Sequence, residues 1–389
     1  MFGVLPDYVR CGLEDLIVCI NKTFPVPKRF APHLGAEIAA LSRLLTSARS
    51  ERDAGYLGRA NFRSAYLRFF LPWNVFRLCK LFAGKDGENR VFPINPPKNG
   101  VCADLGSGTL TTPLALWICF PQLRETPLVF YCLDSCAKAL EDGITLFNAF
   151  TTDKNKEKPL LWTIKPVKTN VFRFKLPQKA DLITAFNLYN ELFGAVKQGD
   201  LAAMELFAQK TKNQLSPALK EGGGVLIAEP GIPRSGQFLS LLRTVFINSG
   251  YSIKLPCAHD GRCPAPGGKK GAKWCHFVFP VDEAPAALQA VSREASLEKE
   301  KATVSFLYAE KNSKNKIPAS RNRNLTALRV ISGSIRLSGA VSGVYCCSKH
   351  GLVLALDREN ARSPVSGDLI YREFPQKKDY DKKSGALIV

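Results

Sequence analysis

A short apolar run that leads directly into a glycine turn constrains the fold of this chain more than any other feature. Residues 101–105 read Val-Cys-Ala-Asp-Leu, and Gly106 and Gly108 follow at once. Further apolar runs, separated by stretches of helical or mixed pattern, lie at 128–133, 181–186 and 224–228. This alternation predicts an α/β fold in which helices cover both faces of a parallel sheet.

Prolines and changes in residue pattern divide the chain into three predicted parts. Residues 1–95 are expected to form an N-terminal helical region, because apolar residues recur three and four positions apart. A cluster of prolines at 93–97 ends this region, and residues 96–280 are expected to form a Rossmann-like domain. Residues 281–389 are expected to form a small β-rich region, with strands near 328–337, 343–347 and 351–356.

The glycine loop has the character of a cofactor site. Asp104, Gly106 and Gly108 fall at the carboxyl end of the first predicted strand, where open α/β sheets bind ligands. The next strand ends in Asp134, which is placed to accept hydrogen bonds from ribose hydroxyls. The pattern resembles the D-x-G-x-G loop of class I S-adenosylmethionine-dependent methyltransferases, with a nicotinamide site and a vestigial loop as alternatives. Leu110 stands where such loops often carry a third glycine.

Polar residues also follow the later predicted strands. Asn187, Asn190 and Glu191 come after the strand at 181–186, and Glu229 ends the strand at 224–228. We include Asn187 in the predicted cofactor site; a helix cap with its first turn is the structural alternative for this group. No evident catalytic cysteine or histidine stands at these ends. Methyl transfer can proceed largely by positioning, because the sulfonium donor is already activated, so no catalytic residue is assigned.

Five of the twelve cysteines gather in two places. Cys257, Cys263 and Cys275 lie in a proline- and glycine-rich loop at 255–276, and Cys346 and Cys347 are adjacent. Three thiols on such a loop can converge on one metal centre, with a fourth from the doublet. Thiolate-rich sites select zinc or iron–sulfur clusters, and the spacing, which lacks C-x2-C, favours a larger object than one ion. Buried free cysteines are the structural alternative.

The histidines and lysines of this loop have secondary expected roles. His259 and His276 are predicted to support the thiols and not to act as ligands themselves. The basic residues around the loop would offset thiolate charge or contact nucleic-acid phosphates; they are Lys254, Arg262, Lys269, Lys270 and Lys273.

The overall charge indicates a polyanionic partner. The chain has 54 Lys and Arg residues against 34 Asp and Glu residues, a formal net charge of +20, which points most simply to nucleic acid. One stretch, residues 54–84, contains no acidic residue, and its basic residues are Arg59, Arg63, Arg68, Arg77 and Lys80. They form either a solvated amphipathic face or a surface that contacts phosphates.

Six segments together resemble a known family. They are Asp104-Leu-Gly-Ser-Gly, Asn190-Glu-Leu, Gly223-Gly-Val-Leu-Ile-Ala-Glu-Pro-Gly, Pro256-Cys-Ala-His-Asp-Gly-Arg-Cys-Pro, Trp274-Cys-His-Phe and Ala361-Arg-Ser-Pro-Val-Ser-Gly-Asp. The combination is similar to the methyltransferase-like small-ribosomal-subunit assembly proteins of the Rsm type, found in mitochondria and bacteria. The similarity extends over most of the chain from about Tyr56 onward.

The resemblance implies a class I methyltransferase fold, S-adenosylmethionine as cofactor, and a [4Fe–4S] cluster, with zinc as the alternative metal. It also implies action on the small ribosomal subunit and its rRNA in assembly and translation. By position, Cys257, Cys263 and Cys275 correspond to three cluster ligands. Strand alternation does not decide between Cys346 and Cys347 for the fourth, and we prefer Cys346. The protein is then either a possible rRNA methyltransferase or a non-enzymatic assembly factor that uses the fold as an RNA-binding scaffold.

The N-terminal segment predicts the compartment. It lacks a charged region ahead of an apolar stretch, and Asp7, Glu14 and Asp15 interrupt it, which argues against a secretory signal and an acid-poor transit peptide. No stretch predicts a membrane span. We therefore expect a monomer without a membrane partner, in the cytoplasm of a bacterium, or in the mitochondrial matrix if the source is eukaryotic.

Overall fold

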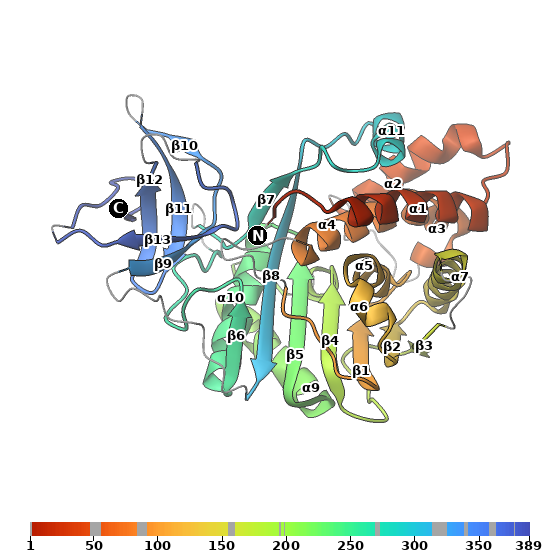
Figure 1. Ribbon diagram of the computed structural model, residues 1–389, viewed down its shortest axis with the longest axis horizontal. Helices are drawn as coiled ribbons and strands as arrows, with labels where there is room; N and C mark the ends of the chain where they lie inside the picture. Colours follow the sequence, from red (N-terminus) through yellow and green to blue (C-terminus); the bar gives the residue numbers. More distant parts are fainter. Residues whose placement is uncertain are drawn as a thin grey trace.

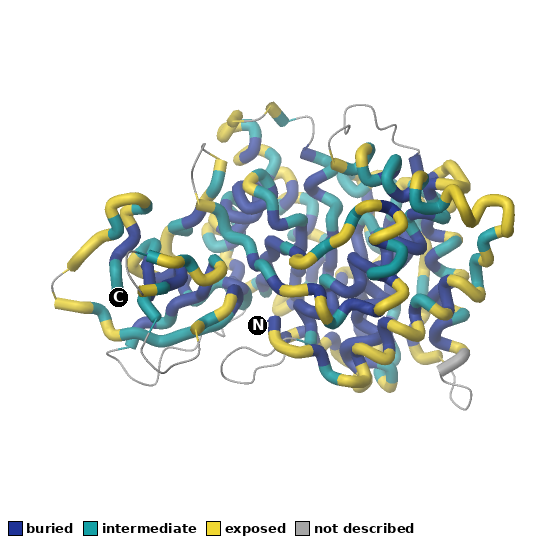
Figure 2. Tube along the Cα trace, turned by 90° about the horizontal axis from the view of Figure 1, so that it is seen from above, coloured by how far each residue is buried: buried dark blue, intermediate teal, exposed yellow. Residues whose placement is uncertain are grey.

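The computed structural model consists of a large α/β part and a smaller β-rich part (Figure 1). It describes residues 2–46, 56–83, 92–154, 160–193, 196–197, 199–268, 273–312, 325–337, 341–357, 363–376 and 378–389. Figure 2 shows that buried backbone is concentrated in the large part, whereas exposed residues mark its outer turns and much of the smaller part.

The large part is built on one sheet with the strand order β3-β2-β1-β4-β5-β8-β6, and β7 pairs with β8 beside this path. The strands are β1 Gly100–Leu105, β2 Leu128–Asp134, β3 Trp162–Lys168, β4 Ala180–Phe186, β5 Leu219–Glu229, β6 Tyr251–Leu255, β7 Phe277–Pro280 and β8 Lys301–Lys311. Strands β1 to β5 are parallel, and β8 runs antiparallel to both β5 and β6. The predicted parallel sheet is thus confirmed, with one antiparallel strand inserted.

Helices cover both faces of this sheet, as predicted. They are α5 Thr111–Cys119, α6 Pro121–Arg124, α7 Ala137–Lys154, α8 Tyr189–Leu192, α9 Leu201–Leu215 and α10 Pro233–Asn248. Strand β1 shows the arrangement, because Cys102 packs in the core that contains α5 and α7, whereas Ala103 packs in the core that contains α9 and α10. All six residues of β1 are buried, which is why its sequence, apart from Asp104, is apolar and does not alternate.

The N-terminal region is helical, as predicted, and packs against α5 and α7. Its elements are α1 Asp7–Thr23, η1 Ala31–His33, α2 Leu34–Leu45, η3 Tyr56–Gly58, α3 Ala60–Ala65, η4 Tyr66–Phe70 and α4 Leu71–Phe82. The π-helical segment η4 directly precedes α4. Pro72 therefore lies in the first turn of α4, where its missing N–H breaks no helical hydrogen bond.

The chain then adds a last helix, a last strand of the large sheet and a second sheet. Helix α11 spans Ala286–Glu294, and β8 follows it. The second sheet has the order β13-β9-β11-β12-β14, with β10 paired to β11. Its strands are β9 Leu325–Val330, β10 Ile335–Arg336, β11 Ser342–Ser348, β12 Gly351–Leu356, β13 Leu369–Glu373 and β14 Leu387–Ile388.

The β-rich C-terminal region of the predicted fold class is thereby confirmed. The boundary predicted at residue 280 lies before β8, which still belongs to the large sheet. Within the described ranges, none of the helices has the length and apolar character needed to cross a bilayer.

Candidate functional site

The carboxyl ends of β1 and β2 hold the glycine loop in a fixed shape. Gly106 and Gly108 have φ angles of 66° and 50°, in the left-handed region that favours glycine. A Cβ at Gly106 would lie 2.7 Å from Cδ1 of Leu188, so the backbone of the loop is closely packed there. Leu110 also has a positive φ, of 61°, and it is fully buried. The third position of the loop therefore keeps the conformation of a glycine although it carries leucine.

The two aspartates of this edge have different environments. Asp104 is buried, and its carboxylate accepts hydrogen bonds from Ser107 Oγ at 2.6 Å and Thr184 Oγ1 at 2.7 Å. Burial raises the pKa of Asp104 to about 6. Through its bonds to Ser107 and Thr184, the carboxylate of Asp104 links the loop to β4. Asp134 lines a cavity, and its carboxylate accepts the backbone N–H groups of Gly108 at 2.9 Å and Cys136 at 2.8 Å. Burial also raises the pKa of Asp134 above its usual value.

A second group of polar residues lies at the ends of β4 and β5. Asn187 has a φ of 53°, and its Nδ2 donates to Oδ1 of Asn74, 3.2 Å away on α4. Glu229 is completely buried and accepts the backbone N–H groups of Tyr189 at 2.8 Å and Asn190 at 3.0 Å. Its carboxylate therefore caps the short helix α8 from the neighbouring strand. Burial raises the pKa of Glu229 to about 8.

These ends open into a cavity of about 670 Å³. The predicted residues Gly106, Gly108, Asp134 and Asn187 line it, whereas Asp104 does not. The opposing wall was missed from the sequence; it comes from the N-terminal helices and consists of Tyr66, Phe69, Phe70, Trp73, Asn74 and Arg77. The many aromatic residues at 66–73 could have indicated a cavity wall, but the same composition is equally typical of a helix that packs into the core.

The cysteine loop lies between β6 and β7, and it meets the second sheet at β11. Burial raises the pKa of Cys347, and the three thiols of the loop lie close enough to raise it further; they are Cys257, Cys263 and Cys275. Cys346 is buried instead with Val330 and Val353 inside the second sheet, and no cysteine affects its pKa. The preference for Cys346 as the fourth ligand stays a prediction, but in the structure the thiol of Cys347, and not that of Cys346, lies beside the three thiols of the loop.

Two buried arginines flank these four thiols, which we call the thiol cluster. Arg243 on α10 donates from Nε to Sγ of Cys257 at 3.1 Å and from Nη2 to the carbonyl of His259 at 2.6 Å. Arg329 on β9 donates to the carbonyls of Pro256 at 2.8 Å and Gly367 at 2.7 Å. One cation thus comes from a helix of the large part and the other from the second sheet, and both are suited to offset the charge of thiolates.

The histidines of the loop differ in position. Nε2 of His259 lies 3.1 Å from Sγ of Cys347. His276 instead stacks on Trp274, with ring centroids 4.6 Å apart. Among the residues that the structure describes, no group of three or more His, Cys, Asp or Glu side chains is arranged to hold a metal ion.

Of the five basic residues around the loop, two contact other side chains, Arg262 is exposed, and two lie outside the described residues. Lys254 pairs with Glu310 at 3.2 Å, and Nζ of Lys273 lies 4.7 Å from the ring centroid of Tyr345. Lys269 and Lys270 belong to the residues that the structure does not describe.

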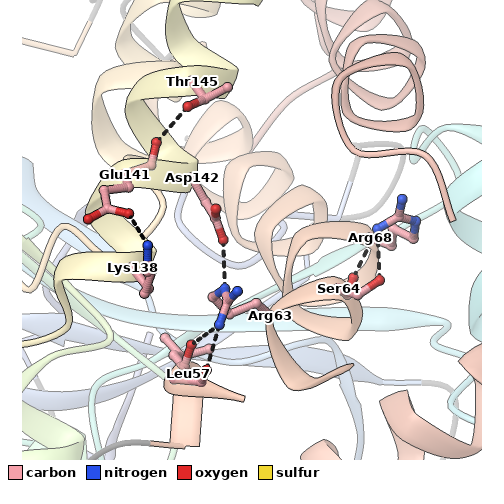
Figure 3. A network of polar contacts seen from close by, with 9 residues as sticks. Leu57, Arg63, Ser64, Arg68, Lys138, Glu141, Asp142 and Thr145 are labelled. Carbon is pink, nitrogen blue, oxygen red and sulfur yellow. Dashed lines mark hydrogen bonds and ion pairs between the residues drawn. The ribbon is translucent and has the colours of Figure 1, made fainter. Parts of the chain in front are cut away.

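The acid-free basic stretch of the N-terminal region faces inward at most of its positions. Arg63 pairs with Asp142 of α7 at 2.9 Å, and Arg68 donates to Ser64 (Figure 3). Arg68 also donates to the carbonyl of Phe24. Lys80 is 2% exposed and pairs with Glu283 at 2.5 Å. The hypothesis that this stretch is a surface for phosphates is thus wrong at these three residues, because their partners come from distant parts of the chain.

Solved structures with detectable similarity include several methyltransferases. A SAM-dependent methyltransferase from Thiobacillus denitrificans in complex with S-adenosyl-L-homocysteine has 13% identity and a TM-score of 0.32, with 56% of this chain and 86% of that chain covered. Magnesium protoporphyrin IX methyltransferase from Synechocystis PCC 6803, with bound SAH, has 11% identity and a TM-score of 0.32, with 71% and 99% covered.

The family comparison concerns the second half of the large sheet and most of the small one. None of the curated proteins compared with the chain matches it. The strand order with its antiparallel β8 agrees with the class I methyltransferase fold that the sequence motifs implied. Residues 200–356 match the family described as mitochondrial small ribosomal subunit Rsm22, which confirms the resemblance to the Rsm type.

Proposed function

We propose that this protein is a methyltransferase-like protein of the small ribosomal subunit that binds S-adenosylmethionine and contacts rRNA during assembly. The cavity at the carboxyl ends of β1, β2, β4 and β5 carries the cofactor part of the proposal. Gly106 and Gly108 leave the backbone open to a ligand, and Asp134 retains acceptor capacity toward two ribose hydroxyls.

The residues of the cavity would act by orienting the bound groups. Asn187 is held by Asn74, and Glu229 is held by the backbone of α8. Among the described residues that line the cavity, Cys136 is the one cysteine and none is a histidine, and the thiol of Cys136 is hydrogen-bonded to no base there. A methyl transfer here would therefore rest on alignment of donor and acceptor. The alternative, an assembly factor that uses this fold as a scaffold for RNA, requires no transfer.

Calorimetry with S-adenosylhomocysteine tests the cofactor site. We expect Asp134→Ala to weaken binding by about tenfold or more, because it removes hydrogen bonds to a charged acceptor. Asp142→Asn is the control, since Asp142 lies on α7, pairs with Arg63 of α3 and does not line the cavity. Absence of binding to the unmodified protein would refute the cofactor proposal and favour the scaffold.

We further propose that the thiol cluster holds a [4Fe–4S] cluster, with zinc as the alternative, and that Cys347 provides the fourth thiol. Three thiols come from the loop after β6 and one from β11, so a metal centre would tie the two sheets together. The buried cations Arg243 and Arg329 would compensate the negative charge of the thiolates. The donor set therefore has the chemistry of a thiolate centre.

The rRNA partner is proposed from two observations. The family matched by residues 200–356 is described by its place in the mitochondrial small ribosomal subunit, and the chain has a net charge of +20. For a eukaryotic source, the mitochondrial matrix would be the compartment. Binding of purified protein to small-subunit rRNA, measured against a duplex of unrelated sequence, tests this part of the proposal.

A further inference from the structure

One wall of the cavity carries two cations that nothing proposed so far uses. Arg77 comes from α4, and Lys299 comes from the segment between α11 and β8. Both side chains line the cavity beside Phe69 and Trp73. Nζ of Lys299 lies 4.4 Å from the ring centroid of Phe69 and 5.0 Å from that of Trp73. Arg77 and Lys299 are 222 positions apart in sequence, and the fold brings them to one wall of the cavity.

Neither cation has a counter-charge among the residues that the structure describes. Nη1 of Arg77 donates to Oδ1 of Asn74 at 2.7 Å, whereas its Nε is buried without a hydrogen-bond partner. Over the described ranges, no ion pair involves Arg77 or Lys299, and no carboxylate affects the pKa of either side chain. Burial, reinforced by the charge of Arg77, lowers the pKa of Lys299 to about 8.

The acidic groups of the same cavity have other roles. Asp134 and Glu229 accept backbone N–H groups, and the side chain of Glu298 is exposed to solvent. Glu191 also lines the cavity, but it affects the pKa of neither Arg77 nor Lys299. Two neighbouring, partly buried cations with no anion beside them carry a cost of desolvation and mutual repulsion. An anionic group that enters between them removes this cost and occupies the orphaned Nε of Arg77.

We propose that Arg77 and Lys299 form an oxyanion subsite of this cavity, for a carboxylate or a phosphate. The guanidinium can donate to such a group from a fixed fork, and the ammonium can add a second charge. The rings of Phe69 and Trp73 hold the ammonium by cation–π contact, which restricts where the anion can lie. Two ligands could supply it, the amino-acid carboxylate of the cofactor or the phosphate of a nucleotide acceptor. The identity of these sources rests on the proposed function, but the subsite does not.

The subsite is tested on the protein without substitutions, with inorganic phosphate as the probe. Reductive methylation with ¹³C-formaldehyde followed by NMR gives the pKa of Lys299, which is assigned by its loss in Lys299→Gln. An anion stabilises the charged amine, so phosphate should raise the pKa of Lys299 from about 8 toward the ordinary value for lysine. Lys210 is the control, because it is exposed and lies over the ring of Phe172 at 4.5 Å. If Lys299 responds no more than Lys210, the proposal is wrong.

The two sources are separated by calorimetry with Lys299→Gln and Arg77→Gln. S-Adenosylhomocysteine carries the carboxylate, and 5′-methylthioadenosine lacks it. If the cofactor fills the subsite, both variants should lose about tenfold or more in affinity for S-adenosylhomocysteine and keep their affinity for 5′-methylthioadenosine. If the phosphate of a nucleotide fills the subsite, both variants should instead lose affinity for adenosine monophosphate.

Failure of the subsite and failure of the proposed function give different results. An unmodified protein that binds neither adenosyl compound, but whose Lys299 responds to phosphate, refutes the cofactor site and retains the subsite. A protein that binds S-adenosylhomocysteine equally in all variants, with no response to phosphate or adenosine monophosphate, retains the cofactor site and refutes the subsite. Thermal unfolding of the variants verifies that each is folded at the temperature of measurement.

Discussion

Replacing Lys80 by methionine separates the two roles considered for the basic N-terminal stretch. Lys80 is 2% exposed, and its Nζ contacts Oε2 of Glu283 at 2.5 Å and the carbonyl of Gly3 at 2.8 Å. The other carboxylate oxygen of Glu283 accepts the N–H of Leu5 at 2.7 Å. This pair therefore fastens the N-terminal segment to the loop that precedes α11.

The expected loss follows from what the substitution leaves behind. Methionine keeps the apolar stem but leaves Glu283 without its cation in a mostly buried place, which should lower the free energy of unfolding by about 3–5 kcal/mol. Adding Glu283→Gln should recover much of this loss, because no unpaired charge then remains. Lys138→Met is the matched control: Lys138 pairs with Glu141 at 2.6 Å, but both side chains are more than half exposed. Its loss should be below about 1 kcal/mol.

Urea unfolding followed by circular dichroism measures these differences, and filter binding measures the affinity for small-subunit rRNA. We expect Lys80→Met to shift the unfolding midpoint and to leave the rRNA affinity of the folded protein unchanged. If Lys80→Met is as stable as Lys138→Met but binds rRNA more weakly, the reasoning is refuted and Lys80 contacts phosphates after all.

Three further predictions follow from the site and the charge. Cys347→Ser should lose the iron and sulfide of anaerobically purified protein, whereas Cys346→Ser should keep both; equal metal content in the two variants would contradict the assignment. The raised pKa of Glu229 means that the folded state binds more protons than the unfolded chain, so this residue should make stability fall as pH rises from about 4.5 to 8, at up to about 1.4 kcal/mol per pH unit. Glu229→Gln should remove that part of the slope in urea unfolding at several pH values, and an unaltered slope would exclude Glu229 as its source. Affinity for rRNA should fall steeply with salt because of counterion release, and a flat salt response would contradict electrostatic binding.

The strands and the glycine loop could be predicted because their signals are local. Fully buried strands such as β1 have continuous apolar sequences, and the loop after it needs residues that tolerate positive φ. Interactions between distant segments left no such signal. The stretch with Arg63 and Lys80 lacks acidic neighbours in sequence, and its counter-charges, Asp142 and Glu283, come from elsewhere in the chain.

The cysteine doublet shows a second limit of the same kind. Period-two alternation places Cys346 and Cys347 on opposite faces of β11, but it does not tell which face meets the loop. That depends on how the two sheets pack, which places Cys346 inside the small sheet and Cys347 toward the thiols. The aromatic wall of the cavity was hidden for a related reason, since core residues and ligand-facing residues of a helix have the same composition.

Leu110 has a consequence for how the loop can receive a ligand. A leucine at a φ of 61° is held there by its burial, with its side chain against Gly143, where an added Cβ would lie 2.6 Å from Cδ1 of Leu110. Glycine would reach this conformation without strain but would also leave it easily, whereas the packed leucine cannot leave it without opening the core. The loop thus loses its conformational entropy when the protein folds. Binding of a ligand then requires no further ordering of this backbone.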